Sequence, residues 1–214
     1  GDIVWYLSPQ DVLTIGKFFT EGKYDASCIV GLCGSEVKKP RYYKAIKGTS
    51  IKPMVDGNVK EGEQRYISGN VLTGEKIYKE GYLGFYDNQV TVIPEGNYHE
   101  FLGWAMPGIG KYSVSRTFLS WLNPSKKYKL DTNLHGGERA FVLSGQYEKV
   151  LPMDIYPVQL LKAILVEDID QMENLGIYEV DEEDFALCEF VCTSKINSQS
   201  IIRKGLDLMR KEMS

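Results

Sequence analysis

Strand-like and helix-like patterns occupy different parts of this chain, and that separation restricts its fold most. Between residues 37 and 96, short strand-like runs are broken by Gly, Asn and Pro, as in "EQRYISGNVLTG" and "YLGFYDNQVTVIP". From Asp154 onward, apolar residues recur instead at intervals of three and four, which is typical of helices. Strands followed by helices indicate an α+β fold or separate domains.

Residues 1–35 show a third pattern, in which a strand, a helix and a second strand follow one another. "DIVWYL" predicts the first strand and "SCIVGLCG" the second, while Ser8 followed by Pro9 is a typical helix start. Two parallel strands do not form a stable sheet by themselves. We therefore expect residues 1–35 to be the C-terminal piece of a truncated α/β domain, in a chain cut from something longer.

The rest of the chain divides into three parts. Residues 36–100 read as a small β-rich domain, and residues 101–153 as a Gly/Pro-rich connection with short elements. Residues 154–214 read as a small helical bundle, in which Asp181 and Asn197 are placed to cap two helices. The expected fold class is α+β, with a remnant of an α/β domain at its start.

Charge and hydropathy exclude two classes of protein. The chain has 25 basic and 29 acidic residues, which gives a net charge of −4 and none of the basic excess of a nucleic-acid-binding protein. Its longest apolar runs fall far short of the roughly 18 residues that a membrane span needs. Four cysteines in a chain of this length indicate no disulfide scaffold and favour a reducing cytoplasm.

The spacing of Cys188 and Cys192 raises the question whether they bind a metal or a cluster. On the helix that Asp181 caps, residues four apart have Cβ atoms about 5 to 6 Å apart, against about 3.8 Å in a disulfide. The other cysteines and the histidines are scattered over three expected domains: Cys28, Cys33, His99 and His135. We therefore predict that both thiols are packed in a core and that this chain holds no metal.

Two glycine-containing motifs resemble catalytic loops but lack the rest of the machinery. "LHGGERAF" (134–141) is like the His-Gly-Gly loops of lipases, yet the G-x-S-x-G nucleophile elbow is absent. "MPGIGKYS" (106–113) fails the G-x₄-G-K-[ST] pattern of phosphate-binding loops. We expect no catalytic residue in either. The aromatic residues around the second motif, Trp104 and Trp121, read as core or interface anchors.

Long stretches of the chain resemble one family. The stretch from "TNLHGGERAF" to "FVCTSK" (132–195), the tail "GLDLMRKE", and the upstream segments "QDVLTIGKFF" and "VKKPRYYKAIKGTSI" are similar to the C-terminal half of the A-subunit of bacterial Na⁺-translocating NADH:quinone reductases. In its order of domains that A-subunit is similar to the flavin-binding subunit of complex I and to its Rnf relative. The resemblance implies that residues 36–100 form a β-grasp domain of the soluble-ligand-binding type.

The resemblance also implies a role. In that family a membrane complex passes electrons from NADH to ubiquinone and exports Na⁺, with its flavins and iron–sulfur centres in other subunits. This chain would be a peripheral part on the cytoplasmic side of the inner membrane, docked against a membrane subunit, with no cofactor of its own and no catalytic activity alone. Ubiquinone association is left open for the intact complex, and we expect this chain alone to bind a ubiquinone analogue weakly or not at all.

Contact with the rest of such a complex is expected from the connection at 101–121 and the turn at 135–139. The candidate interface residues are Trp104, Trp121, His135, Gly136, Gly137, Glu138 and Arg139. Two alternatives stay open at this point. One is a free-standing ligand-binding or interaction module that uses the β-grasp domain, and the other is a metalloprotein that uses the cysteines.

Overall fold

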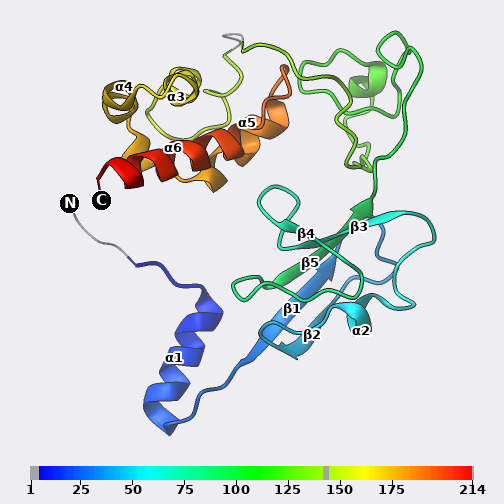
Figure 1. Cartoon of the computed structure of the whole chain (residues 1–214). Helices are drawn as coiled ribbons and strands as arrows, with labels where there is room; N and C mark the ends of the chain where they lie inside the picture. Colours follow the sequence, from blue (N-terminus) through cyan, green and yellow to red (C-terminus); the bar gives the residue numbers. More distant parts are fainter. Residues whose placement is uncertain (1–4, 142–144, 214) are drawn as a thin grey trace. The chain divides into compact units, whose positions relative to one another are not determined.

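A computed structural model describes residues 5–141 and 145–213 and divides the chain into two compact units (Figure 1). The first, called here the sheet unit, runs up to Glu95 and includes Lys129–Thr132. The second, called the helical unit, contains Gly96–Tyr128 and the chain from Asn133 onward. The architecture is mixed α and β, with one open sheet of five strands.

Helix α1 (Pro9–Glu21) begins as the sequence predicts. The hydroxyl of Ser8 accepts a hydrogen bond of 3.2 Å from the backbone N–H of Asp11, and Pro9 is the first helical residue. None of its residues is buried. Of the strand expected over 2–7, residues 2–4 lie outside the described part of the chain, and residues 5–7 form no strand.

Besides α1, the sheet unit contains five strands and a short helix, α2 (Lys52–Val55). The strands are β1 (Ser27–Cys33), β2 (Arg41–Ile46), β3 (Gln64–Ser68), β4 (Glu75–Ile77) and β5 (Gln89–Pro94). They lie in the order β2-β1-β5-β3-β4. The central pair β1 and β5 is parallel, with Leu32 opposite Val90, and all other neighbours are antiparallel.

This sheet differs from the division expected at residue 35. β1 was expected to lie in a separate α/β piece, whereas it pairs with β2 on one side and β5 on the other. Its residues Cys28, Val30 and Leu32 are buried in the same core as the later strands. The physical reason is stability. Strand β1 is apolar and buried at alternate positions, and pairing with two strands far away in the sequence stabilises it more than a local strand–helix–strand unit would.

One glycine in the β1–β2 connection is required by its surroundings. Gly34 has φ +115°, a conformation that other residues rarely adopt. A Cβ atom there would lie 2.0 Å from the carbonyl oxygen of Val92, so the backbone approaches β5 closely. Because Gly34 has no side chain, the chain that follows β1 can pass close to the backbone of β5.

The helical unit contains four α-helices and three 3₁₀ turns among its described residues. They are η1 (Leu119–Leu122), α3 (Pro157–Leu165), α4 (Ile169–Asn174), η2 (Ile177–Glu179), η3 (Glu182–Phe185), α5 (Ala186–Val191) and α6 (Ser198–Glu212). Asp168 and Asn197 cap α4 and α6 through their side chains, and Asp181 forms a capping box with Asp184 at η3. Buried residues from the four α-helices form one core.

The helix expected to follow Asp181 is split. The 3₁₀ turn η3 leads into the short helix α5, and Cys192 is its C-cap rather than a residue within it. Cys188 and Cys192 are both buried in the core of the helical unit, which confirms the packing role predicted for them. In residues 5–141 and 145–213, no helix combines the length and the hydropathy that crossing a bilayer requires.

Candidate functional site

The expected connection at 101–153 contains a folded loop, residues 101–128, which we call the lobe. It holds one 3₁₀ turn and is otherwise shaped by turns. The backbone N–H of Leu119 donates to the carbonyl of Pro107 (3.0 Å), and the hydroxyl of Tyr128 donates to the carbonyl of Ser120 (3.3 Å). Gly108, at φ +63°, packs so close to the Phe118 ring that a Cβ would lie 2.2 Å away. The lobe is therefore held by its own backbone bonds.

Glu95 and Thr132 flank the lobe in the sequence and, as part of the sheet unit, form what we call its base. The Thr132 hydroxyl donates a 2.7 Å hydrogen bond to the Glu95 carboxylate, which also pairs with Arg65 and with Lys76 at 3.1 Å. Arg65 is the main cause that lowers the pKa of Glu95 to about 2, and the hydrogen bonds from Thr132 and Lys76 add to it against burial. At neutral pH the carboxylate is charged and binds the segment after the lobe.

A second ion pair holds the same base. Glu36 is buried, and the ammonium of Lys129 lies 2.7 Å from its carboxylate, with Lys60 at 3.8 Å. Burial raises the pKa of Glu36, but the two lysines outweigh it and the net shift is downward. Neither ion-paired glutamate was predicted from the sequence, since no local pattern links Glu36 to a lysine more than ninety positions away.

The lobe exposes large apolar side chains. Trp104 and Phe101 are 79% and 89% exposed, and Trp121 is 51% exposed. The Leu119–Pro107 hydrogen bond brings the stretch before residue 110 beside η1, so these side chains come from neighbouring segments. Their exposure shows that Trp104 and Trp121 are not core residues, while their role as interface anchors stays a prediction. The other exposed apolar residues are Leu102, Met106, Ile109, Tyr112, Val114, Leu119 and Leu122.

The predicted turn at 135–139 is attached to the segment after α5. The backbone N–H of Arg139 donates to the carbonyl of Ser194 (2.9 Å), and the Ser194 hydroxyl donates to the carbonyl of Ala140 (3.0 Å). A Cβ on Gly136 would lie 3.3 Å from Cε of Lys195, which makes this a close approach. Gly137 has open space around it, so no contact requires a glycine there.

His135 has a left-handed backbone, with φ +47°, and its ring meets the ring of Tyr98 edge to face at 6.4 Å. The side chains of Glu138 and Arg139 are exposed. Tyr112 of the lobe stacks on Phe190 of α5, with ring centroids 5.8 Å apart. Since the turn bonds to Ser194, both the turn and the lobe are attached near the C-terminal end of α5. All seven predicted interface residues thus lie in the helical unit.

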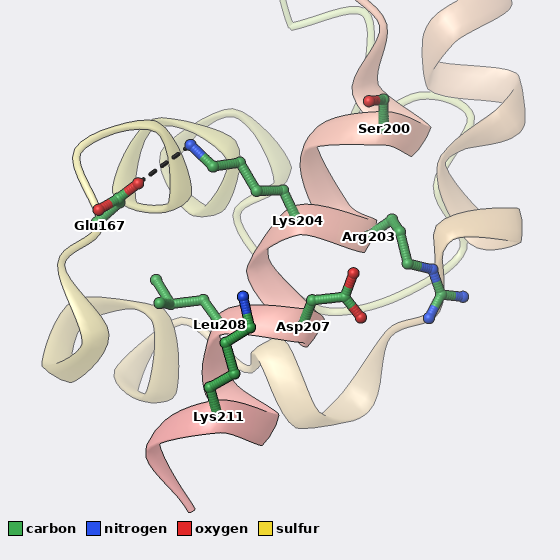
Figure 2. A pocket seen from close by; sticks show the side chains of 7 residues that line it. All are labelled: Glu167, Ser200, Arg203, Lys204, Asp207, Leu208 and Lys211. Atoms are coloured by element: carbon green, nitrogen blue, oxygen red, sulfur yellow. Dashed lines mark ion pairs between the residues drawn. The ribbon is translucent and has the colours of Figure 1, made fainter.

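A hollow beside α6 offers a different kind of surface (Figure 2). Lys204 pairs with Glu167 across it at 3.1 Å, and Arg203 turns toward Asp181 and Glu182 outside it. Charges of both signs compensate one another, as on an ordinary solvated helix face. Its lining is Glu167, Ser200, Arg203, Lys204, Asp207, Leu208 and Lys211. In the part of the chain that the structure describes, no three His, Cys, Asp or Glu side chains group as metal ligands.

Comparison with known proteins gives a consistent family. The model of the NQRA C-terminal domain (NQRA_SLBB) matches residues 29–79. Proteins named as the A-subunit of Na(+)-translocating NADH-quinone reductase are similar over 98% of this chain: 46% identical in Pasteurella multocida (strain Pm70), 44% in Rhodopirellula baltica and 41% in Hahella chejuensis. The matched regions are 47%, 46% and 47% of those proteins, so the chain spans about half the length of these curated relatives.

Proposed function

We propose that this chain is a docking part of a Na(+)-translocating NADH-quinone reductase. The premise is that the chain belongs to the A-subunit family of these reductases. The complex would couple electron transfer from NADH to ubiquinone to the export of Na⁺. This part would lie peripherally on the cytoplasmic side of the inner membrane, beside a membrane subunit. It would assemble the complex without carrying out the redox chemistry.

The observation that carries a docking role is the exposure of the large apolar side chains of the lobe. A surface loop that shows two tryptophans and a phenylalanine to solvent is costly for a protein that acts alone. The loop is nevertheless shaped by its own hydrogen bonds, from Leu119 to Pro107 and from Tyr128 to Ser120. Preformed apolar surface of this kind lowers the entropy cost of binding a partner.

The turn at 135–139 is the second proposed contact. Its backbone is fixed by Ser194, while the charged side chains of Glu138 and Arg139 are exposed. Charges at the edge of an interface set the orientation and the rate of docking, so their loss should lower the yield of assembled complex. Trp104 and Trp121 would supply the apolar anchor, and the His135–Arg139 turn the polar rim.

The two finer fold labels belong to this proposal as well. A β-grasp assignment for the sheet unit is supported by the order β2-β1-β5-β3-β4, by the parallel central pair and by a helix after the first hairpin. A bundle assignment for residues 154–214 is supported by the single core that α3, α4, α5 and α6 share. Quinone association is proposed only for the assembled complex.

Co-purification tests the docking role. The protein is expressed with its membrane partners, and the double variant Glu138→Ala/Arg139→Ala is compared with Lys44→Ala/Glu63→Ala, which removes one exposed charge of each sign from the sheet unit. We expect the first to reduce recovery of the complex severalfold at unchanged melting temperature, and the second to leave it intact. A protein that never accompanies the membrane subunits would favour the free-standing module instead.

A further inference from the structure

The lobe differs from the rest of the chain in charge as well as in hydropathy. Residues 101–128 carry four of the 25 basic residues and none of the 29 acidic ones. The rest of the chain is therefore clearly acidic. The four are Lys111, Arg116, Lys126 and Lys127.

These basic residues divide into two groups. Lys111 pairs with Glu100 and donates to the carbonyl of Gly103 at 2.8 Å, and Lys126 donates to the carbonyl of Ile109, so both help to shape the lobe. Arg116 and Lys127 are exposed. They lie in the same lobe as the exposed tryptophans, so the lobe exposes both apolar and cationic side chains.

We propose that the lobe binds the surface of an anionic phospholipid bilayer, with its exposed apolar side chains in the interfacial region and Arg116 and Lys127 at the headgroups. Tryptophan is amphipathic and is favoured at the boundary of headgroups and acyl chains. Basic residues next to an anionic leaflet each strengthen attachment severalfold. The acidic remainder of the chain is repelled by the same leaflet, so attachment through the lobe has a defined orientation.

The same charges disfavour the other occupants. A second copy would bring two basic lobes together, which is unfavourable. A protein partner would need a surface both apolar and acidic, whereas a bilayer rich in phosphatidylglycerol offers these two properties in adjacent layers. The proposal needs only the residues of the lobe. It assigns Trp104 and Trp121 to the lipid in place of the protein contact proposed above, and leaves the turn at 135–139 to the protein partner.

Vesicle binding by the 214-residue chain tests it. Vesicles of phosphatidylglycerol with phosphatidylethanolamine are compared with vesicles of phosphatidylcholine by flotation and titration. We expect binding to the anionic vesicles that weakens with salt, and at least about tenfold weaker binding to phosphatidylcholine. Absence of binding to the anionic vesicles, or equal binding to both, overturns the proposal.

Matched substitutions place the contact on the lobe. Trp104→Ala should weaken binding by about tenfold or more, because a tryptophan buries a large apolar area. Trp5→Ala, at a tryptophan 88% exposed outside the lobe, should change it less than about twofold. Likewise, Arg116→Gln/Lys127→Gln should weaken binding about tenfold or more. The control Lys38→Gln/Lys39→Gln, which removes two exposed charges from the sheet unit, should have a much smaller effect.

A direct readout avoids dependence on the stability of these variants. In Trp5→Phe/Trp121→Phe the remaining Trp104 should shift its emission to the blue on anionic vesicles and be quenched by brominated lipids. An unquenched Trp104 in vesicle-bound protein overturns the proposal. Retained co-purification without vesicle binding would mean that the lobe docks on protein, whereas vesicle binding without co-purification would refute only the proposed place in the reductase.

Discussion

The hydroxyl of Thr132 donates a hydrogen bond of 2.7 Å to the carboxylate of Glu95, across 37 positions of sequence. The two residues bracket the lobe, so this bond closes a long loop at its base. Arg65 and Lys76, from strands β3 and β4, hold the acceptor carboxylate in place. The closure of the loop therefore depends on a charged group and should respond to pH.

Acid should weaken the sheet unit through Glu95. The folded pKa is about 2, below the ordinary value of 4.5, so the stabilisation is fully present above pH 4.5 and is lost as the pH falls toward 2. We expect the contribution to be about 2 kcal/mol, since the partner Lys76 is solvent-exposed and screened. Glu95→Gln should therefore lower the free energy of unfolding at pH 7 and flatten its pH dependence between 4.5 and 2, measured by urea denaturation.

Glu61→Gln, at an exposed carboxylate of the same unit, is the control for this variant and should change little. Limited proteolysis gives a second readout, because Glu95→Gln should expose the lobe to cleavage at neutral pH. Unchanged stability and unchanged cleavage would show that Glu95 does not hold the base of the lobe.

Two helical glycines should respond to the same substitution with opposite signs. Gly205 lies in α6, and a Cβ there would meet Ile164 at 2.8 Å and Ile177 at 3.0 Å. Gly205→Ala should overpack this contact and destabilise the protein by about 1 to 3 kcal/mol. Gly16 lies inside α1 with open space around it, so Gly16→Ala should stabilise by about 0.5 to 1 kcal/mol. Thermal unfolding of both variants checks the pair, and equal effects would contradict the α3–α6 packing.

Local signals predicted the helices well. Ser8 and Asn197 accept the capping hydrogen bonds expected of them, because a cap is decided by residues within four positions. The helix after Asp181 ended early at Cys192, since tertiary packing decided its length. The division at residue 35 fell inside the sheet because the partner of β1 is β5, and no local pattern encodes a pairing almost sixty positions away.

The candidate site could be predicted only in part. Trp104 and Trp121 read equally well as core residues, because an apolar stretch does not reveal what covers it. Their exposure became evident only from the turns around Gly108 and Pro107. The charge of the lobe, in contrast, is visible in the sequence as a run of 28 residues without Asp or Glu. What the structure adds is that the two tryptophans, Arg116 and Lys127 are all exposed in one folded lobe.

In the core of the helical unit, the hydroxyl of Tyr147 donates a 2.8 Å hydrogen bond to the sulfur of Cys192. Burial raises the pKa of Tyr147, and the hydrogen bond with Cys192 adds to it, so the phenol stays protonated and acts as the donor. Cys192→Ala would leave this hydroxyl buried without an acceptor and should cost about 1 to 3 kcal/mol. Tyr147→Phe should cost about 1 kcal/mol.

A double-mutant cycle isolates the bond between the two side chains. Removing both groups leaves no unpaired hydroxyl, so Tyr147→Phe/Cys192→Ala should cost about 1 kcal/mol less than the two single changes together. Tyr178→Phe, at an exposed tyrosine whose hydroxyl donates to Glu173, is the control and should change stability by less than about 0.5 kcal/mol. Urea denaturation of the four proteins gives the cycle. Strict additivity would mean that Cys192 contributes only its volume, whereas the expected coupling would establish that this thiol holds the donor of Tyr147 in the core.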